Sequence, residues 1–332
     1  MNYLPVIKSL NKEDFDKNII QTALQFRADA QKQLFSLARK KRSENSPQRK
    51  VEVRSVIEIS NICVQNCNFC NINCQSKLKR YTITYEEFMR ITEFLYQKGR
   101  RVLLIQSGEN NTQKYIDFIS KCIGDAKSRF SNLFIILCLG NLNYKQYRQL
   151  KIAGADRYIN KFETSNPILY KKIKPKDSLE KRIECINMLS DLDFEVGSGN
   201  IVGFPGQTNQ DLVEDLLFIN QLRLSMISTS IFISGEDSNY SSEPHGDIDT
   251  TLNYMALMRI LYPKMLIPST SSLERAAKGG QYLGLMAGAD TVTIHDGTPQ
   301  HLKKSFPVYS INRFIPNEEH IKGIVKRANM II

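Results

Sequence analysis

Three cysteines lie within eight residues of one another in the run SNICVQNCNFC, which covers residues 60–70. Thiolates at Cys63, Cys67 and Cys70 could hold three corners of a [4Fe–4S] cluster from a single loop. Three protein ligands leave one iron open, and a small molecule that carries an amine and a carboxylate can chelate that iron. The spacing therefore predicts an iron–sulfur centre with one open coordination site.

A zinc site is the alternative for the same cysteines. Structural zinc takes four ligands, usually as two separated pairs, and Cys74 could supply the fourth. However, no second Cys/His pair follows at the usual spacing. Seven cysteines spread over 332 residues, without an export signal, also argue against a disulfide framework. The spacing leaves Cys74 either as a bystander or as a functional thiol.

The composition, with 42% hydrophobic residues, predicts one large globular domain. The sequence has no signal peptide and no apolar run of roughly 20 residues, so a cytoplasmic location with no membrane partner is expected. The net charge of +11 comes from scattered lysines without a nucleic-acid motif, so no nucleic-acid partner is expected. The same charge could steer an acidic electron donor toward the cluster.

After residue 50, apolar β-branched runs alternate with segments of helical periodicity. The runs predict eight strands, at 51–60, 102–106, 133–139, 157–159, 194–202, 226–233, 265–267 and 291–294. Helices are predicted between them, at 85–98, 113–127, 144–153, 179–192, 208–222, 251–262 and 279–287. This alternation favours an α/β fold of the (β/α)8 TIM-barrel type, with a partial barrel of fewer strands as the alternative.

The residues before the first strand predict an N-terminal helical extension, 1–50, followed by a barrel domain, 51–332. Two amphipathic helices are expected within 12–42 of the extension. The cysteine loop begins where the first strand ends, and barrel active sites lie at the carboxyl ends of their strands. The loop is therefore predicted to lie at the mouth of the barrel.

Phe69 completes the pattern C-x3-C-x-aromatic-C of radical S-adenosylmethionine (SAM) enzymes. From about residue 25 to 314 the chain resembles the subfamily of biotin synthase, [FeFe]-hydrogenase maturase E and methylornithine synthase. The similar segments are VIEISNICVQNCNFC, LKRYTIT, LLIQSGE, GADRYINKFETSNPILYKKIKP, GNIVGFPGQT and LIPSTSSLE. The resemblance implies a [4Fe–4S] cluster and SAM, and a 5′-deoxyadenosyl radical that takes hydrogen from a small substrate sealed inside the barrel. It also implies an electron donor of the flavodoxin or ferredoxin type.

The resemblance assigns SAM-binding roles to residues outside the cysteine loop. The segment Ser107, Gly108 and Glu109 resembles the stretch that lines the SAM amino group. Glu163 matches a glutamate near SAM, and Arg182 matches an arginine that pairs with the SAM carboxylate. Residues 201–206 resemble the loop beside the adenine, where Gly203 and Gly206 would allow close backbone approach, although a simple strand-to-helix turn explains these glycines equally well.

The chain also departs from each of these relatives. Biotin synthase holds an inner [2Fe–2S] cluster with three cysteines and an arginine, and only Cys138 matches, because Gln106 and Gly197 occupy the other two positions. At the eighth predicted strand, His295 and Asp296 are expected to face the cavity as a catalytic pair that binds substrate or relays a proton. A hydrogen-bonded loop turn is the alternative. Ser234, Glu236 and Asp237, after the sixth strand, are further candidates for substrate contacts, or else a solvated loop.

Three functions follow as hypotheses. The leading one is a radical SAM enzyme similar to hydrogenase maturase E or methylornithine synthase. The second is sulfur insertion similar to that of biotin synthase, for example in lipoyl formation, which would use Cys138 or another sulfur source. The third, from a different class, is a non-catalytic iron–sulfur binding or scaffold protein.

Overall fold

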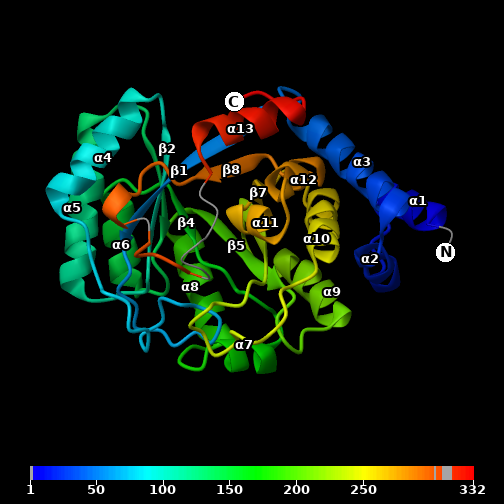
Figure 1. Ribbon diagram of the computed structural model, residues 1–332, viewed down its shortest axis with the longest axis horizontal. Coiled ribbons are helices and arrows are strands. Elements are labelled where there is room, and N and C mark those ends of the chain that lie inside the picture. The colour runs from blue at the N-terminus through cyan, green and yellow to red at the C-terminus, as the bar shows by residue number, and fades with distance from the viewer. Residues whose placement is uncertain (1–2, 303, 309–315) are drawn as a thin grey trace.

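The protein is described by a computed structural model of residues 3–302, 304–308 and 316–332. Eight strands form a single parallel sheet in the order β6-β5-β4-β3-β2-β1-β8-β7. Their bounds are β1 Glu52–Ser60, β2 Val102–Ser107, β3 Phe134–Cys138, β4 Arg157–Ile159, β5 Glu195–Val202, β6 Met226–Ile231, β7 Pro268–Ser269 and β8 Thr291–Ile294. The predicted (β/α)8 barrel is therefore confirmed (Figure 1).

The seam between β6 and β7 closes the barrel through a few backbone contacts. Ile227 N donates to Leu266 O at 2.9 Å, and Leu266 N donates to Ser225 O at 3.1 Å. The seventh strand was predicted at 265–267, which is wrong by a few residues, because the ladder with β8 forms at Pro268–Ser269. Leu266 instead forms an isolated bridge to Met226. The barrel is consequently nearly closed, with its weakest pairing at this seam.

Helices cover the outside of the sheet. Those after β1 are α4 Tyr85–Gln97, α5 Gln113–Arg129, α6 Tyr144–Ile152, α7 Pro167–Ile173, α8 Leu179–Asp191, α9 Asn209–Phe218, α10 Ile248–Leu261, α11 Ser271–Ala276, α12 Gly280–Met286 and α13 Glu318–Arg327. Short 3₁₀ turns lie at Ile219–Gln221 and Gln300–Leu302. α7, α11 and α13 were not predicted, since the first two are at most seven residues long and too short for a clear period. Within the described residues, no helix is long and apolar enough to cross a membrane.

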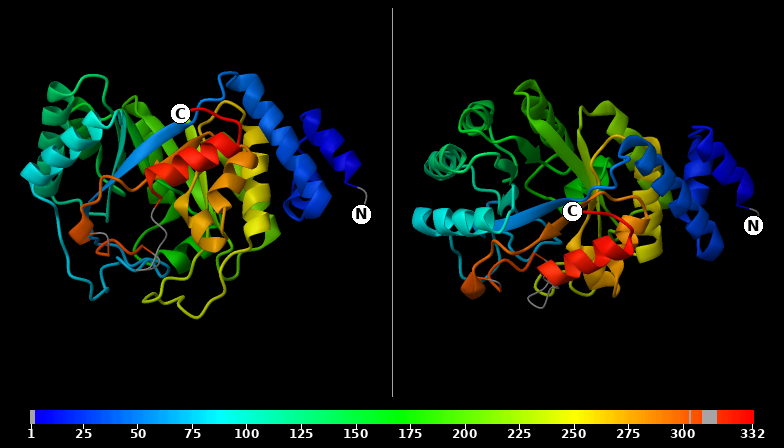
Figure 2. Two further views of the ribbon diagram at one scale, coloured as in Figure 1. Left: turned by 45° about the horizontal axis from the view of Figure 1, so that its top comes forward. Right: turned by 90° about the horizontal axis from the view of Figure 1, so that it is seen from above.

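Three helices precede the barrel, at α1 Leu4–Asn11, α2 Lys17–Leu24 and α3 Ala28–Asn45. The sequence predicted two, and α1 was missed. Figure 2 shows them projecting on one side of the barrel, next to α10. Asn253 of α10 ties them down, because its Nδ2 donates to Leu24 O at 3.0 Å and to Phe26 O at 2.8 Å. The domain boundary at residue 50 stays a prediction.

Alternate residues of each strand face the inside of the barrel. Val56, Leu104 and Ile136 form a small inner apolar cluster, separate from the large core between sheet and helices. Because successive strand residues point to opposite faces, this cluster fixes the inward positions on both sides of it. Toward the amino ends of the strands the next layer is ionic, with Arg157 Nη1 2.8 Å from Glu52 Oε2. Toward the carboxyl ends the inward positions are polar, and these form the candidate site.

Candidate active site

The cysteine loop follows β1 and is held closed by one arginine. Arg80 donates to the carbonyl of Asn61 at 2.6 Å, to that of Ile72 at 2.8 Å and to that of Ser76 at 3.1 Å, and it also donates to Asn73 O. A guanidinium has five N–H donors and can gather several carbonyls at once. Arg80 therefore fixes the return of the chain after the cysteines, which gives the LKRYTIT segment a structural purpose.

Cys63, Cys67 and Cys70 lie partly buried on this loop, whereas Cys74 is exposed. Burial raises the pKa of the Cys67 thiol to about 11 and that of Cys70 further, and the neighbouring thiols Cys63 and Cys67 add to the rise at Cys70. The buried Lys174 opposes this effect at all three thiols, because a nearby cation favours the thiolate. The donor set, three adjacent thiols beside one buried ammonium group, fits an anionic iron–sulfur cluster. In the described residues no three His, Cys, Asp or Glu side chains are arranged to hold a single metal ion.

Gly108 lies directly under the cysteine loop. A Cβ at this position would meet Ile62 O at 2.4 Å and Cys63 Cβ at 2.7 Å, so a larger residue would displace the loop. Gly108 N donates to Ser60 O at 3.1 Å, and Val64 N donates to Glu109 O at 2.9 Å. The segment after β2 therefore supports the first cysteine through its backbone.

Aromatic rings pack beneath the other side of the loop. Phe69 lies 5.3 Å from Phe204 between ring centroids, and Phe204 lies 5.4 Å from Phe232. The chain reaches Phe204 through Gly203, which has a φ of +95° and no room for a side chain, because a Cβ would lie 2.4 Å from Gly246 Cα. The aromatic residue of the cysteine motif thus contacts the segment predicted to border the adenine.

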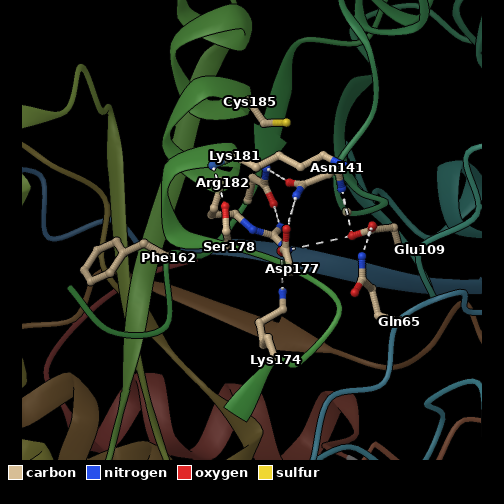
Figure 3. Close-up of polar contacts among 12 residues, drawn as sticks. Gln65, Glu109, Asn141, Phe162, Lys174, Asp177, Ser178, Lys181, Arg182 and Cys185 are labelled. Carbon is tan, nitrogen blue, oxygen red and sulfur yellow. Dashed lines mark hydrogen bonds and ion pairs between the residues drawn. The ribbon is translucent and has the colours of Figure 1, made fainter. Parts of the chain in front are cut away.

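Arg182 of α8 is the centre of a buried polar network (Figure 3). Its Nη2 lies 2.7 Å from Asp177 Oδ2, its Nε donates to Tyr170 OH at 3.1 Å, and its Nη1 donates to Asn160 Oδ1. Burial alone would lower the pKa of Arg182, but the surrounding groups, Tyr170 and Asp177 first, raise it well above its usual value. Arg182 is therefore positively charged and is held in place by these contacts.

Asp177 and Glu109 supply the negative charge of this network. Asp177 Oδ2 also accepts from Tyr170 OH at 2.7 Å and lies 3.5 Å from Lys174 Nζ. Although burial acts to raise it, the pKa of Asp177 falls to about 2, because Arg182 and Lys174 stabilise the carboxylate. Glu109 accepts from Gln65 Nε2 at 2.5 Å and lies 3.7 Å from Arg182 Nη2.

This network changes the expected picture of SAM binding. Arg182 and Glu109 were predicted to bind the carboxylate and the amino group of SAM, yet both side chains have protein partners here. Ser107 Oγ likewise donates to Gly108 O at 2.6 Å. Their roles toward SAM stay predictions, while their contacts with one another and with the loop are structural facts.

Glu163 presents a carboxylate toward the cysteines. Its backbone has a φ of +64°, which is uncommon for a residue with a side chain, and it is held between Gly199 O and Ile201 N of β5 at 2.9 and 3.0 Å. Its Oε2 is buried without a hydrogen bond and lies 3.3 Å from Lys161 Nζ. The charge of Glu163 raises the pKa of both Cys67 and Cys138, although burial is the larger cause. A hydrogen-bond acceptor of this kind fits the predicted site for a cationic group.

Asp215 of α9 holds the turn that carries Glu163. Its Oδ1 accepts from Ser165 N at 2.5 Å and Ser165 Oγ at 2.7 Å, and its Oδ2 accepts from Asn200 Nδ2 at 3.1 Å. Burial raises the pKa of Asp215 to about 6 in spite of these donors. A left-handed conformation at a glutamate persists only where its surroundings enforce it, and Asp215 supplies part of that constraint.

Polar side chains occupy the inward positions near the carboxyl ends of the strands, namely Glu58, Gln106, Cys138, Lys161, Ser230 and His295, and the barrel interior at this level is called the chamber. Gln106 and Cys138 are direct neighbours in the β2–β3 register. Lys161 Nζ lies 3.4 Å from Ser230 Oγ. Cys122 and Cys185 belong to the core between sheet and helices. Among the described strand positions, Cys138 is thus the one inward cysteine, which leaves the donor set for an inner sulfur cluster incomplete.

His295 and Asp296 do not form the expected pair. His295 faces the chamber, where its Nδ1 lies 3.2 Å from Glu58 Oε1. Asp296 lies instead beside Arg100, with 2.9 Å between its Oδ2 and Arg100 Nε. The two side chains therefore have different partners, and their catalytic role stays a prediction. The acid beside the histidine is Glu58 of β1, which the sequence did not identify.

The loop after β6 lies against the cysteine loop. Ser234 Oγ lies 3.1 Å from His245 Nδ1, and Asp237 N donates to Asn71 Oδ1 at 3.2 Å. Glu236 and Asp237 are exposed. Their predicted contacts with substrate stay untested.

Several site residues escaped the sequence reading, namely Glu58, Gln65, Arg80, Asn141, Lys174, Asp177 and Asp215. Glu58, in VIEIS, interrupts an otherwise apolar alternation, which is a signal for an inward functional position. Lys174 and Asp177 lie in a lysine-rich segment, where nothing in the residue types distinguishes the buried charges from the exposed ones.

The chain is similar in sequence and in fold to known proteins. A model of the radical SAM superfamily matches residues 57–219. The [FeFe] hydrogenase maturase subunit HydE of Thermotoga maritima is 34% identical over 307 residues, which cover 92% of this chain and 86% of the relative. A biotin synthase of Clostridium acetobutylicum is 27% identical over 74% of the chain and 76% of the relative. The crystal structure of a methylornithine synthase superposes with a TM-score of 0.85 at 22% identity, over 98% of this chain and 95% of the other.

Proposed function

The chain belongs to the radical SAM superfamily, and we propose that it acts on a small substrate inside the barrel in the manner of hydrogenase maturase E. The observation that carries the proposal is the 34% identity to HydE over 92% of the chain. The cofactors of the superfamily are a [4Fe–4S] cluster and SAM, which together supply a 5′-deoxyadenosyl radical that abstracts hydrogen from the substrate. An electron donor of the flavodoxin or ferredoxin type completes the proposal.

The residues of the loop would hold the cluster. Cys63, Cys67 and Cys70 provide the thiolates, and the buried Lys174 stabilises their negative charge. Gly108 keeps the loop seated by leaving room for Ile62 and Cys63. Arg80 holds the returning chain through four carbonyls.

Other side chains would bind SAM and keep the site dry. Glu163 would bind the ammonium group of SAM through its buried Oε2, whose contact within the protein is the ion pair with Lys161 at 3.3 Å. Arg182, held by Asp177, provides a fixed positive charge near the same region. The rings of Phe69, Phe204 and Phe232 exclude water from one side, which protects reactive intermediates.

The chamber would bind the substrate. Lys161 and Ser230 lie on one wall, and Glu58 with His295 lies where β1 meets β8. His295 next to Glu58 can hold or move a proton at Nδ1, which makes it the proposed acid–base group. Sulfur insertion is not favoured, because Cys138 alone faces the chamber from the described strands.

Anaerobic reconstitution with iron and sulfide tests the proposal. About four irons per chain and formation of 5′-deoxyadenosine from SAM with dithionite are expected. Cys67→Ala should lose both, while Cys74→Ser, four residues past the last ligand, should keep both. A wild-type protein that binds four irons yet makes no 5′-deoxyadenosine would favour the scaffold hypothesis. Retained 5′-deoxyadenosine in Cys67→Ala would refute the ligand assignment.

A further inference from the structure

Gln65 lies in the cysteine loop between Cys63 and Cys67, and it is only 9% exposed. Its backbone carbonyl accepts a hydrogen bond from Cys74 N at 2.8 Å. Its side-chain Nε2 donates to Glu109 Oε1 at 2.5 Å, and Figure 3 shows the amide nitrogen directed at this carboxylate. Backbone and side chain are both held, so the position of the Gln65 amide is fixed relative to the loop that carries the cysteines.

Glu109 determines which way the amide of Gln65 points. A carboxylate accepts hydrogen bonds but does not donate them, so the amide nitrogen must face Glu109 and the amide oxygen must face away from it. The other oxygen of Glu109 accepts from Asn141 N at 2.9 Å. Gly140 leaves room for this carboxylate, because a Cβ at that position would overlap Glu109 Oε2. The carboxylate is therefore itself held in place, and the Gln65 amide cannot turn over without losing its partner.

The amide oxygen of Gln65 lacks a hydrogen-bond donor. Its Oε1 is buried, and within the part of the chain that the structure describes no group donates to it. Leaving a buried acceptor unsatisfied costs free energy, so buried amide oxygens in folded proteins normally have a donor. An unsatisfied acceptor with a fixed direction, inside a candidate active site, indicates that a bound ligand supplies the donor.

The pair of Gln65 and Glu109 lies against the first cysteine of the loop. Burial raises the pKa of the Cys63 thiol, and the backbone N–H groups of Gln65 and Glu109 oppose this rise through hydrogen bonds to the sulfur. A ligand on the open iron of a cluster held by this sulfur would therefore lie near the Gln65 amide. SAM carries an amino group, and a nitrogen with bound hydrogens can donate to an amide oxygen.

We propose that Gln65 is a further SAM-binding residue, whose Oε1 accepts a hydrogen bond from the amino group of SAM, and that Glu109 is a positioning residue that acts through the Gln65 amide. The inference rests on the proposed function, which requires SAM at the open iron. It replaces the expected direct contact of Glu109 with a contact through its neighbour. Glu163 remains a second acceptor for the same group, because an ammonium group has three N–H donors.

Removal of the Gln65 amide tests the proposal. Gln65→Met keeps a side chain of similar length but replaces the amide with a thioether, which is only a weak acceptor. The matched control is Gln75→Met, at an exposed glutamine of the same loop. Each reconstituted protein is analysed for iron, and its affinities for SAM and for 5′-methylthioadenosine are measured by equilibrium dialysis. 5′-Methylthioadenosine has neither the amino nor the carboxylate group of SAM, so it reports on the rest of the site.

Gln65→Met should keep about four irons per chain. It should bind SAM about threefold to tenfold more weakly than the wild type, which is the usual effect of one lost hydrogen bond. Its affinity for 5′-methylthioadenosine should not change, and Gln75→Met should match the wild type in every measurement. An unchanged affinity for SAM would overturn the proposal. A loss of iron, or an equal loss of affinity for both ligands, would also overturn it, because Gln65 would then be a structural residue.

Glu109→Gln tests the positioning role without removing Gln65. An amide at position 109 can donate as well as accept, so it no longer fixes the direction of the Gln65 amide, and SAM affinity should fall by about twofold to fivefold. In the Gln65→Met background the same change should cause no further loss, whereas additive losses would overturn the role of Glu109. A wild-type protein that binds SAM but forms no 5′-deoxyadenosine with dithionite would instead count against the proposed function.

Discussion

Asp177 is a buried carboxylate with four protein partners, and Asp177→Asn removes its negative charge. The carboxylate contacts Arg182 at 2.7 Å, Tyr170 at 2.7 Å, Asn141 at 3.1 Å and Lys174 at 3.5 Å. Without it, the nearest carboxylate to Arg182 is Glu109, at 3.7 Å. Loss of one partner of a buried ion pair costs about 3 to 5 kcal/mol, because the other charge stays buried.

The pKa of Asp177 gives an independent magnitude. A fall in this pKa from its ordinary value of 3.8 to about 2 in the folded protein corresponds to about 2 kcal/mol. Because the folded-state pKa is lowered, this stability is fully present above pH of about 4 and is lost as the pH falls through about 2. The two magnitudes agree in order, and the larger one includes the lost hydrogen bonds.

Thermal unfolding measures the effect. At about 2.1 cal/mol/K per residue, 332 residues give an unfolding entropy of about 0.7 kcal/mol/K, so Tm should fall by about 4 to 7 °C in Asp177→Asn. The control is Asp191→Asn, on the same helix as Arg182. The ion pair of Asp191 with Arg223 is more than half exposed and should contribute less than about 1 kcal/mol to stability. If the two variants unfold within about 1 °C of each other, the buried network does not stabilise the site.

Three further predictions concern the loop, the Glu163 turn and SAM. Gly108→Ala should reduce the iron content after reconstitution, because its Cβ would lie 2.4 Å from Ile62 O, while Gly124→Ala, with open space around it, should bind iron normally. Burial raises the pKa of Asp215 to about 6, so the contribution of this group to the free energy of unfolding is greatest below about pH 4 and falls by about 3 kcal/mol as the pH rises through about 6. Urea unfolding of Asp215→Asn at a series of pH values should lack this dependence on pH. Glu163→Gln should weaken SAM binding in equilibrium dialysis by about tenfold or more, and an unchanged affinity would remove Glu163 from the SAM site.

The sequence predicted the barrel and the cysteine loop because both signals are local. Strand and helix periods repeat within single segments, and the cysteines lie within eight residues. The prediction was weakest for short elements. β7 has two residues and was misplaced, and α1 has eight residues with Pro5 in its first turn and was missed. Such segments gain their structure from tertiary contacts, which periodicity cannot reveal.

The site depends on contacts between segments that are distant in the chain. His295 meets Glu58 only because β8 pairs with β1, and the closing strand pair of a barrel cannot be read from either strand alone. Residue types predicted the neighbour Asp296 as its partner, but strand geometry turns that side chain to Arg100. Arg182 was identified from resemblance, yet its partner Asp177 lies in a lysine-rich segment without a periodic signal.

The residues proposed to hold the cluster and SAM lie in a different part of the chain from some of the residues proposed to bind the substrate. The superfamily model covers residues 57–219, and this range holds the three cysteines, Gly108, Glu163 and Arg182, which are the groups proposed to hold the cluster and SAM. Ser230 of β6 and His295, which directly follows β8, lie outside it. Glu58 lies inside the matched range but pairs with His295 outside it. The pairing of β1 with β8 thus joins the matched range to residues outside it, and we expect a change of substrate to involve residues at this strand pair rather than residues of the cysteine loop.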